Sequence, residues 1–414
     1  MTGTAVELDL YSPQVFGQGP PHDLWAELRR HEPVSRSRAA NGTPFWSVTR
    51  HADCEFVLKN PKLFSSTSGT ILGSVGADDS AGGRTITLMD PPDHGQLRRP
   101  AIRVIGHSIV RRRIQEMRQD ISTLLAGYLD GESHDFAELT HLLPMAMSGR
   151  LLGIPPEHWS TVATNMAASI APDDPTHRRG RSVEDTLRES HHALFACFLE
   201  VIERRRAEPG DDLISALLTM TVNGSRLEDL DVMLNCFSLL IGANSTTPHL
   251  VAQILQLLTD QDLVRRLLAG SGRPGTSEVV PLDVDRFLEE AARWATPTHH
   301  LVRRCSSRIE LAGRTIEPGD WVCLWIGSAN RDERVFEEAD AFRPDRSPNP
   351  HLSFGAGPHY CIGAPISRAG LRIVVDELLT RTTSIESTGA ASILLSNWIH
   401  GYTALPLRAI RRED

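Results

Sequence analysis

A short loop near the C-terminal end of the chain, residues 354–364, places three glycines around a single cysteine, Cys361. Glycines allow positive φ angles and a close approach of backbone amides. An apolar helical pattern over residues 366–379 follows directly, so Cys361 precedes a predicted helix. Backbone N–H groups at such a position lower the basicity of a thiolate and fix its place. By itself the pattern fits either a buried structural cysteine or a thiolate ligand.

The composition is that of an ordinary globular protein. The chain has 414 residues, 43 lysines and arginines against 52 aspartates and glutamates, a net charge of −9, and 40% hydrophobic residues. An acidic chain without a block of like charges does not favour binding to a nucleic acid backbone. No segment approaches the roughly 18 uninterrupted apolar residues of a membrane span, and the acidic start lacks the features of a leader peptide. We therefore expect a cytoplasmic protein that binds neither nucleic acid nor membrane.

Hydrophobic periodicity predicts a mostly helical chain. Helical spacing dominates residues 97–266. Residues 303–311 and 315–326 predict short strands around turns at Ala312-Gly313 and Pro318-Gly319, and a long irregular stretch follows over 330–353. Proline- and glycine-rich breaks fall at residues 73–83, 171–180 and 270–281. We expect one domain over residues 1–414, mainly α with a small β region (α+β).

The cysteine loop resembles the haem-binding signature of the cytochrome P450 family, Phe-Gly-x-Gly-x-(His/Arg)-x-Cys-x-Gly, at every fixed position. The resemblance implies that Cys361 is the axial thiolate ligand of the iron of haem b (iron protoporphyrin IX). It also implies that Phe354 packs beside the sulfur, that Gly355 and Gly363 belong to the cofactor-binding loop, and that His359 meets a haem propionate. The fold implied is the cytochrome P450 fold, with a long central helix over the haem.

A second motif lies in residues 286–294, where Glu290 and Arg293 share one face of a predicted helix. Such pairs are common on surfaces, where each contributes about 0.2–0.5 kcal/mol. In the cytochrome P450 family the corresponding pair is buried and bonds to the coil ahead of the cysteine loop, where Arg346 supplies the matching arginine. The resemblance therefore implies that Glu290, Arg293 and Arg346 form a structural ion-pair network without a catalytic role.

Residues 90–99 predict the start of a helix, because Asp90 can cap it and proline is favoured in the first turn. His94 and Arg98 then share a face, which by itself fits a solvated polar surface. The segment also resembles the family's Asp-Pro-Pro-x-His-x-x-x-Arg helix, whose His and Arg bind a haem propionate. Arg303 matches the strand arginine that completes this clamp, and a guanidinium suits a carboxylate because it can donate two parallel hydrogen bonds.

A long apolar helix is predicted over residues 230 to about 258, entered by a capping box at residues 225–228. Within it, residues 239–248 resemble the family's oxygen-activation string, (Ala/Gly)-Gly-x-(Asp/Glu)-Thr-(Thr/Ser), in which an acid and a threonine relay protons to dioxygen. Thr246 matches the threonine. Ser245, however, stands at the acid position, and Ala243 stands at the second small position.

The serine leaves three alternatives open. Water and Thr246 could deliver the protons, a substrate carboxyl or hydroxyl group could complete the relay, or the chemistry could differ from ordinary hydroxylation. Pro248 lacks the N–H that would bond to the carbonyl of Asn244, so we expect a kink there. We hypothesise that this freed carbonyl holds a water beside Thr246, the alternative being a kink that serves packing alone.

The resemblance also indicates the walls of the substrate pocket. They include Leu239 on the central helix, Thr298 and His299 in a turn, and Trp398 and Ile399 near the end of the chain. This mixture suits a medium-sized, partly polar natural product, such as a polyketide or other secondary metabolite, better than a bare alkane. For His299 the alternative is a solvent-facing side chain.

The reaction implied by the resemblance is the insertion of one oxygen atom of O2 into a small-molecule substrate. The chain has no fused flavin or iron–sulfur motif, so we expect a separate ferredoxin and ferredoxin reductase to supply electrons. Arginines on the cysteine side could dock an acidic iron–sulfur partner, namely Arg99, Arg103 and residues 111–113. Two alternatives stay open: peroxide-driven oxidation or oxidative coupling, suggested by Ser245, and a haem sensor or carrier without turnover.

Overall fold

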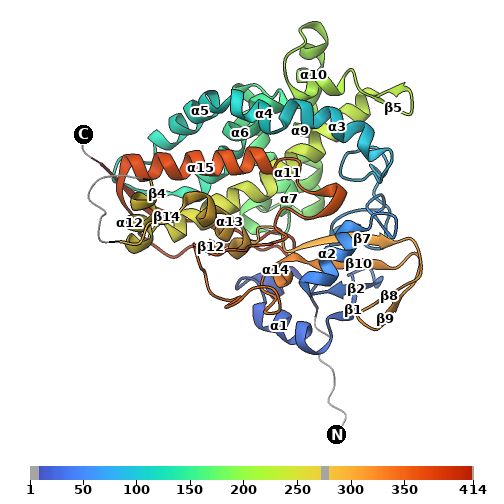
Figure 1. The fold of residues 1–414 in the computed structure, drawn as a ribbon. Helices are drawn as coiled ribbons and strands as arrows, with labels where there is room; N and C mark the ends of the chain where they lie inside the picture. The colour runs from blue at the N-terminus through green and yellow to red at the C-terminus, as the bar shows by residue number, and fades with distance from the viewer. Residues whose placement is uncertain (1–8, 272–278, 413–414) are drawn as a thin grey trace.

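The computed structural model describes residues 9–271 and 279–412. Helices form the upper, larger part of the molecule in Figure 1, and the main sheet lies below them. This mainly helical architecture with small sheets confirms the predicted fold class. The helices of the larger part are α3 (His94–Ile105), α4 (His107–Arg112), α5 (Ile114–Ala126), α6 (Phe136–Leu152), α7 (Trp159–Ile170), α8 (Pro175–Arg178), α9 (Val183–Ala207), α10 (Leu213–Leu217), α11 (Asp229–Leu257), α12 (Gln261–Gly270), α13 (Val284–Ala295) and α15 (Ala364–Arg381).

The main sheet joins strands that are far apart in the sequence. Its order is β1-β2-β10-β7-β3, antiparallel except for the parallel pair of β2 and β10. The central strand β10 is buried along its whole length, which matches its uninterrupted apolar sequence. The strands are β1 (Val34–Arg38), β2 (Pro44–Val48), β3 (Phe64–Ser65), β7 (His300–Cys305) and β10 (Trp321–Trp325), and the nearby helices are α1 (His22–His31), α2 (His51–Lys59) and α14 (Ile326–Ala329).

The two strands predicted between residues 303 and 326 are each divided. After β7 the Ser306 N–H bonds to the Leu63 carbonyl at 2.8 Å, and the chain leaves the main sheet as a separate hairpin. The predicted turn is present, since Ala312 and Gly313 have φ angles of 47° and 76°. The remaining strands pair as β8 (Ile309–Leu311) with β9 (Arg314–Ile316), β5 (Thr221–Val222) with β6 (Ser225–Arg226), β12 (Ser392–Ile393) with β13 (Tyr402–Ala404), and β14 (Pro406–Arg411) between β11 (Thr382–Ser387) and β4 (Ser133–Asp135).

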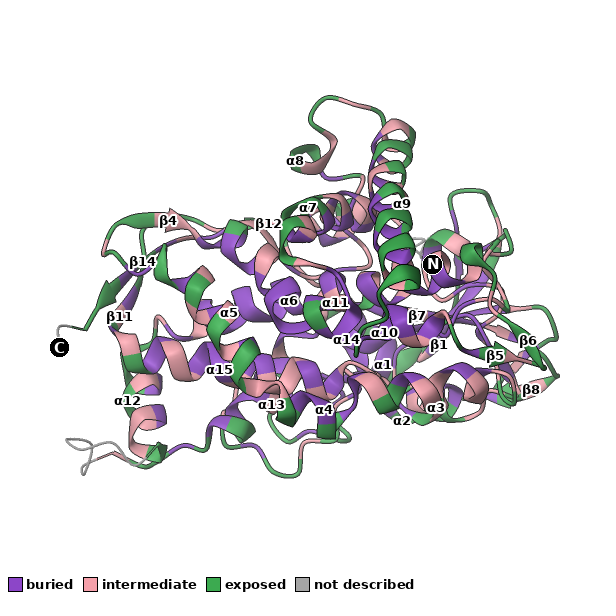
Figure 2. Cartoon of the chain, turned by 90° about the horizontal axis from the view of Figure 1, so that it is seen from above, coloured by how far each residue is buried: buried purple, intermediate pink, exposed green. Residues whose placement is uncertain are grey.

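Helix α11 runs beside α6 through the helical part (Figure 2). Its bounds agree with the predicted long helix, but its start corrects the predicted capping box. Glu228 is the N-cap residue, and its side chain forms the box with Asp231. Ser225 instead belongs to β6, because the turn at Asn223, with a φ of 51°, folds the chain back on β5.

Helix α3 also begins later than predicted, at His94. The Asp90 carboxylate does not cap it, since it accepts hydrogen bonds from Ser65 Oγ at 2.5 Å and from Ser66 N at 3.0 Å. A short polar side chain can accept hydrogen bonds from different backbone or hydroxyl donors, which compete for it. Here Ser65 and Ser66, which are distant in the sequence, bond to the carboxylate that would otherwise cap the helix.

Residues 330–353, which are all described, contain no helix or strand, as predicted. The predicted break at residues 270–281 lies mostly outside the described residues, whereas the break at 171–180 contains the short helix α8. The largest buried apolar cluster draws on α6, α7, α9, α11, α13 and α15, and Figure 2 shows the burial concentrated along α6 and α11. None of the helices in the described ranges combines the length and the hydropathy of a bilayer span.

Candidate active site

The cysteine loop is held by backbone contacts that require glycine. The chain turns at Gly355 and Gly357, each with a φ of 68°. A Cβ at position 357 would lie 2.6 Å from the Leu58 carbonyl oxygen, so the loop rests directly on the backbone of α2. Cys361 N donates to the Phe354 carbonyl at 2.8 Å. These contacts fix Cys361 just ahead of the first turn of α15.

The groups around the Cys361 sulfur shift the pKa of its thiol in opposite directions. Burial raises the pKa of the thiol, whereas the N–H groups of Gly363 and Ala364 and the guanidinium groups of Arg98 and Arg368 act to lower it. Cys361 is half-buried, and the other five cysteines are buried. A metal ion at the sulfur would offset the cost of burial and stabilise the thiolate.

His359 of this loop lies with one histidine and two arginines from other segments. The rings of His94 and His359 stack with centroids 4.2 Å apart. Arg98, one turn after His94 on α3, donates to the carbonyl of Tyr360 in the cysteine loop. Burial, followed by the nearby Arg303 guanidinium of β7, lowers the pKa of His359 to about 3. The structure thus brings together the four residues that the sequence grouped.

Arg303 carries a buried positive charge with little to balance it. It is 4% exposed, and its one hydrogen bond to the described chain is to the Val302 carbonyl at 2.8 Å. Burial lowers its pKa to about 10, opposed by the carboxylate of Asp90. That carboxylate is already engaged by the serines that precede it in the sequence. A buried cation without an anion is costly.

His94 also has a buried polar atom without a partner in the described chain. Its Nε2 is buried with no hydrogen-bond partner in the described chain, and burial, then the Arg98 charge, lowers its pKa to about 4. Buried polar atoms normally have partners. A ligand that brings carboxylates next to Cys361 would satisfy both His94 and Arg303, so the residues present fit a haem with its two propionates.

One side of helix α11 is left uncovered at Gly242, Ala243 and Thr246. Gly242 is exposed although it lies mid-helix, and a Cβ there would meet no atom within 4 Å. Ala243 and Thr246 are partly exposed on the same side, and Thr246 Oγ1 donates to the Gly242 carbonyl over a long 3.4 Å. Ser245 is 2% exposed. On this side the helix therefore exposes a hydroxyl and backbone, while the serine is buried.

The side chain of Asn244 packs against α6. Its Nδ2 donates to the Leu240 carbonyl at 2.9 Å and contacts Met145 Sδ at 3.6 Å. The role suggested for Asn244 thus rests on its backbone carbonyl, which Pro248 leaves without its helical donor. Helix α11 continues through Pro248, and the kink stays a prediction.

The ion-pair network has all of its charges satisfied. Arg293 and Glu290 are fully buried and form two parallel hydrogen bonds of 2.7 and 2.8 Å. Arg346 Nε lies 3.1 Å from both Glu290 oxygens. The remaining guanidinium donors bond to carbonyls of residues 330–341. The network thus ties α13 to the irregular stretch ahead of the cysteine loop.

Four of the predicted pocket-wall residues lie side by side. Thr298 pairs with Ile399 in an isolated bridge, and His299 N donates to the Trp398 carbonyl at 2.8 Å. Thr298 and Trp398 are half-buried. The fifth, Leu239 of α11, is 9% exposed.

His299 is not solvent-facing. It is 2% exposed, and its ring packs against Phe16 and His400 with centroids 4.8 and 5.5 Å away. Its Nδ1 has no hydrogen-bond partner among the described residues. The alternative of an exposed histidine is therefore wrong, because partners at both ends of the chain cover it.

Sequence reasoning missed Arg368 of α15. Its guanidinium lies over the Phe354 ring, 4.4 Å from the centroid, and it bonds to both oxygens of Glu289 at 2.6 and 2.8 Å and to Tyr360 Oη at 3.0 Å. It braces the cysteine loop against α13. The signal that could have found it is the position of Arg368 in the predicted helix, seven residues after Cys361.

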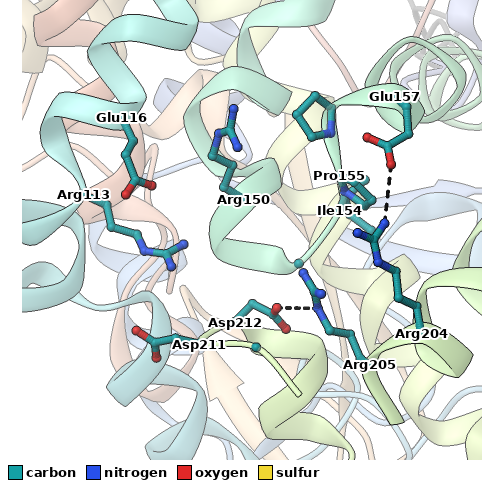
Figure 3. Close-up of a pocket in the computed structure, with 13 residues that line it drawn as sticks. Arg113, Glu116, Arg150, Ile154, Pro155, Glu157, Arg204, Arg205, Asp211 and Asp212 are labelled. Carbon is teal, nitrogen blue, oxygen red and sulfur yellow. Dashed lines mark ion pairs between the residues drawn. The ribbon is translucent and has the colours of Figure 1, made fainter. Parts of the chain in front are cut away.

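A separate charged cleft of about 430 Å³ lies between α5, α6 and the end of α9 (Figure 3). Arg204 pairs with Glu157 at 3.5 Å, and Arg205 pairs with Asp212 at 2.6 Å. Arg113, one of the predicted docking arginines, also lines it. None of the predicted cofactor or catalytic residues does.

Known proteins share this sequence pattern and this fold. The family model described as Cytochrome P450 matches residues 172–384. Linalool 8-monooxygenase of Pseudomonas putida is 31% identical over 407 residues, covering 95% of this chain and 96% of that protein. The structure of P450 OxyD, involved in the biosynthesis of vancomycin-type antibiotics, has a TM-score of 0.85 at 28% identity, covering 98% of this chain and all of that one. Mycobacterium marinum cytochrome P450 CYP268A2, in complex with pseudoionone, has a TM-score of 0.87 at 28% identity and 98% coverage of both chains.

Proposed function

The chain belongs to the cytochrome P450 family, and from that premise we propose that it is a haem-thiolate monooxygenase with Cys361 as the axial ligand of haem b. The observation that carries the proposal is the group of buried cations and unpaired donors beside Cys361. Arg303 lacks an anionic partner, and His94 Nε2 lacks any hydrogen-bond partner, in the described chain. The propionates of a haem whose iron is bound at Cys361 would supply them.

In this proposal His94, Arg98, Arg303 and His359 hold the propionates. Phe354, Gly355 and Gly363 shape the loop around the sulfur, and the N–H groups of Gly363 and Ala364 offset negative charge there. Haem, when bound, supplies the redox-active iron at which O2 is activated. The chain supplies the thiolate, the orientation of the macrocycle and a pocket that limits water.

On the α11 side, the exposed backbone at Gly242 and Ala243 leaves space next to the Thr246 hydroxyl. The 3.4 Å contact from Thr246 to the Gly242 carbonyl is weak, so this hydroxyl can exchange it for a water or a substrate group and hold a proton at Oγ1. The Asn244 carbonyl is a second acceptor for such a water. Ser245 replaces the acid of the family string, so the proton must reach Thr246 by another route.

The proposed substrate is a medium-sized, partly polar natural product such as a secondary metabolite. Leu239 offers apolar surface, whereas Ile399 is fully buried and pairs with the backbone of Thr298. Thr298 and Trp398 offer polar groups, with Trp398 Nε1 buried and without a partner among the described residues. The relatives named for linalool and for vancomycin-type antibiotics support this class. Electrons are proposed to come from a separate ferredoxin and ferredoxin reductase, docked near exposed Arg99 and Arg103.

Labelled oxygen tests the proposal. With reductant, a ferredoxin and its reductase, one atom of ¹⁸O2 should appear in the product of any substrate that the protein converts. Product that forms with peroxide and without O2 or reductant would favour peroxide-driven oxidation. Substrate binding without any product would favour a sensor or carrier.

A further inference from the structure

A stripe of buried polar residues runs along α11. Ser245, His249 and Gln253 follow one another at intervals of four, so they share one face of the helix. They are 2%, 3% and 7% exposed. Long side chains on a helix point back toward its N-terminus, so we expect the His249 ring on the side of Ser245. Neither the Ser245 hydroxyl nor the His249 ring has a hydrogen bond to the described chain, whereas Gln253 bonds to His400 at 3.2 Å.

Two further histidines continue from His249 toward the outside. The His141 ring on α6 lies 5.7 Å from the His249 ring, and the His177 ring on α8 lies 6.3 Å from that of His141. Helix α8 is in the loop between α7 and α9, which stands out from the helical part (Figure 2). Each step between rings is short enough for a direct contact or one bridging water.

The His249 ring packs against a position that only glycine can occupy. A Cβ at Gly401 would lie 2.0 Å from His249 Nδ1, so only glycine lets the chain before β13 pass this ring. Burying a polar ring without a hydrogen-bond partner costs free energy of folding. The position of this ring, one turn from Ser245, suggests a functional role for it.

All three rings are neutral near pH 7. Burial lowers the pKa of His141 to about 4, and it lowers the pKa of His177 and of His249 as well. The groups that face them are His400 toward His249, Asp135 toward His141, and Asp174 and Arg179 toward His177. A neutral imidazole carries one N–H and one bare nitrogen, which is what a proton relay requires. His177 Nδ1 lies 3.3 Å from the Ala171 carbonyl, which leaves its Nε2 as the bare nitrogen.

We infer that His177, His141 and His249 conduct protons from solvent to Ser245 and so replace the acid that this helix lacks. Each imidazole takes a proton on its bare nitrogen and releases the proton of its other nitrogen, and His177 must break the long Nδ1 bond to the Ala171 carbonyl to do so. The last release, from His249, goes to Ser245 Oγ, whose own proton moves to the space beside Thr246. One proton is moved for each passage, and each ring ends neutral with its proton on the other nitrogen, so a ring rotation restores the starting tautomer before the next passage. The inference rests on the proposed monooxygenase function, and the three histidines are positioning residues that touch neither cofactor nor substrate.

Nitrogen NMR tests the relay without turnover. In the ¹⁵N-histidine-labelled, reduced carbon monoxide complex, which is diamagnetic, all three rings should be singly protonated at pH 7. His177→Gln, a change on the half-buried rim, should alter the tautomer of His141. His191→Gln is the matched control, because His191 is another histidine with a pKa lowered by burial but lies on α9 against Phe237. A doubly protonated ring at pH 7, or a His141 tautomer indifferent to His177, would overturn the relay.

Turnover supplies the second test. His249→Gln and His177→Gln should each reduce product formed per O2 consumed by about tenfold or more, and should change the solvent deuterium isotope effect. The carbon monoxide spectrum and the substrate-induced spin shift should stay as in the parent, and His191→Gln should match the parent throughout. Unchanged coupling in both variants would contradict the relay and leave the monooxygenase standing. A parent protein without thiolate-ligated haem or without product would defeat the proposed function itself.

Discussion

Two buried arginine clusters lie in this protein, and they differ in how their charges are satisfied. Around Glu290, the guanidinium groups of Arg293 and Arg346 donate to one carboxylate and to a set of carbonyls. Beside Cys361, Arg303 and His94 are equally buried but have no anion of their own. The first cluster is complete as folded, whereas the second is complete only with a ligand. Burial of charge thus marks a structural site in one place and the proposed cofactor site in the other.

Breaking the complete cluster should have the largest effect. Glu290→Ala leaves two buried guanidinium groups without their carboxylate, which should cost about 3–5 kcal/mol of unfolding free energy. Denaturant unfolding measures this loss. Glu27→Ala, which removes an exposed pair with Arg30, is the control and should cost less than about 1 kcal/mol. Equal losses would mean that the Glu290 network is no more than a surface-like pair.

Removing a charge from the incomplete cluster should act in the opposite way. Arg303→Leu should leave the haem-free protein as stable as the parent or more stable, because an unpaired buried cation is lost. The same change should speed haem loss roughly ten- to a hundredfold, since hydrogen bonds to charged groups contribute about 1.5–3 kcal/mol. Haem transfer to an acceptor protein measures the rate. The neighbouring Arg304→Leu, which removes a pair with exposed Asp78, should leave the rate unchanged.

The pH dependence of stability tests the ion pair of Glu289 and Arg368, which lies beside the cysteine loop. Burial raises the pKa of Glu289, but its bonds to Arg368 and His351 outweigh this and lower it to about 2. The unfolded chain, with a pKa near 4.5, then binds more protons, so stability is lost as the pH falls from about 4.5 to 2. Glu289→Gln should flatten this part of the stability curve, and Arg368→Gln should flatten it too. A parent-like slope in either variant would contradict the assignment.

Exposed arginines should show the smallest effects. Arg103→Gln and Arg112→Gln should change unfolding free energy by no more than about 0.5 kcal/mol. They should still slow reduction by a ferredoxin severalfold at low salt, with the difference shrinking as salt is added. Stopped-flow reduction measures this. Reduction rates equal to those of the parent at every salt concentration would place the docking surface elsewhere.

The parts of the fold that sequence predicted well are those set by local requirements. The apolar period over residues 230–258 and the turn at Ala312 correspond to α11 and to the β8–β9 hairpin. The misplaced starts of α3 and α11 have one cause. Asp90 and Ser225 carry ordinary capping signals, but Ser65 and the β5–β6 hairpin compete for them. Such competition depends on packing that local sequence does not contain.

In the candidate site, too, some features could be predicted from the sequence and others depend on packing. The resemblance to the cytochrome P450 family grouped Cys361, His94 and Arg303 across the chain, and the structure brings them together. His299, in contrast, is covered by Phe16 and His400 from both ends of the chain. The histidine path from His249 was also invisible in sequence, because its members come from α6, α8 and α11 and no short motif links them.

The carbon monoxide difference spectrum of the reduced protein tests the central claim most directly, when it is measured beside Cys361→Ser. The account predicts the strongly red-shifted Soret band of a thiolate-ligated haem in the parent and its loss in the variant. A protein that binds no haem, or a band that does not depend on Cys361, would contradict it.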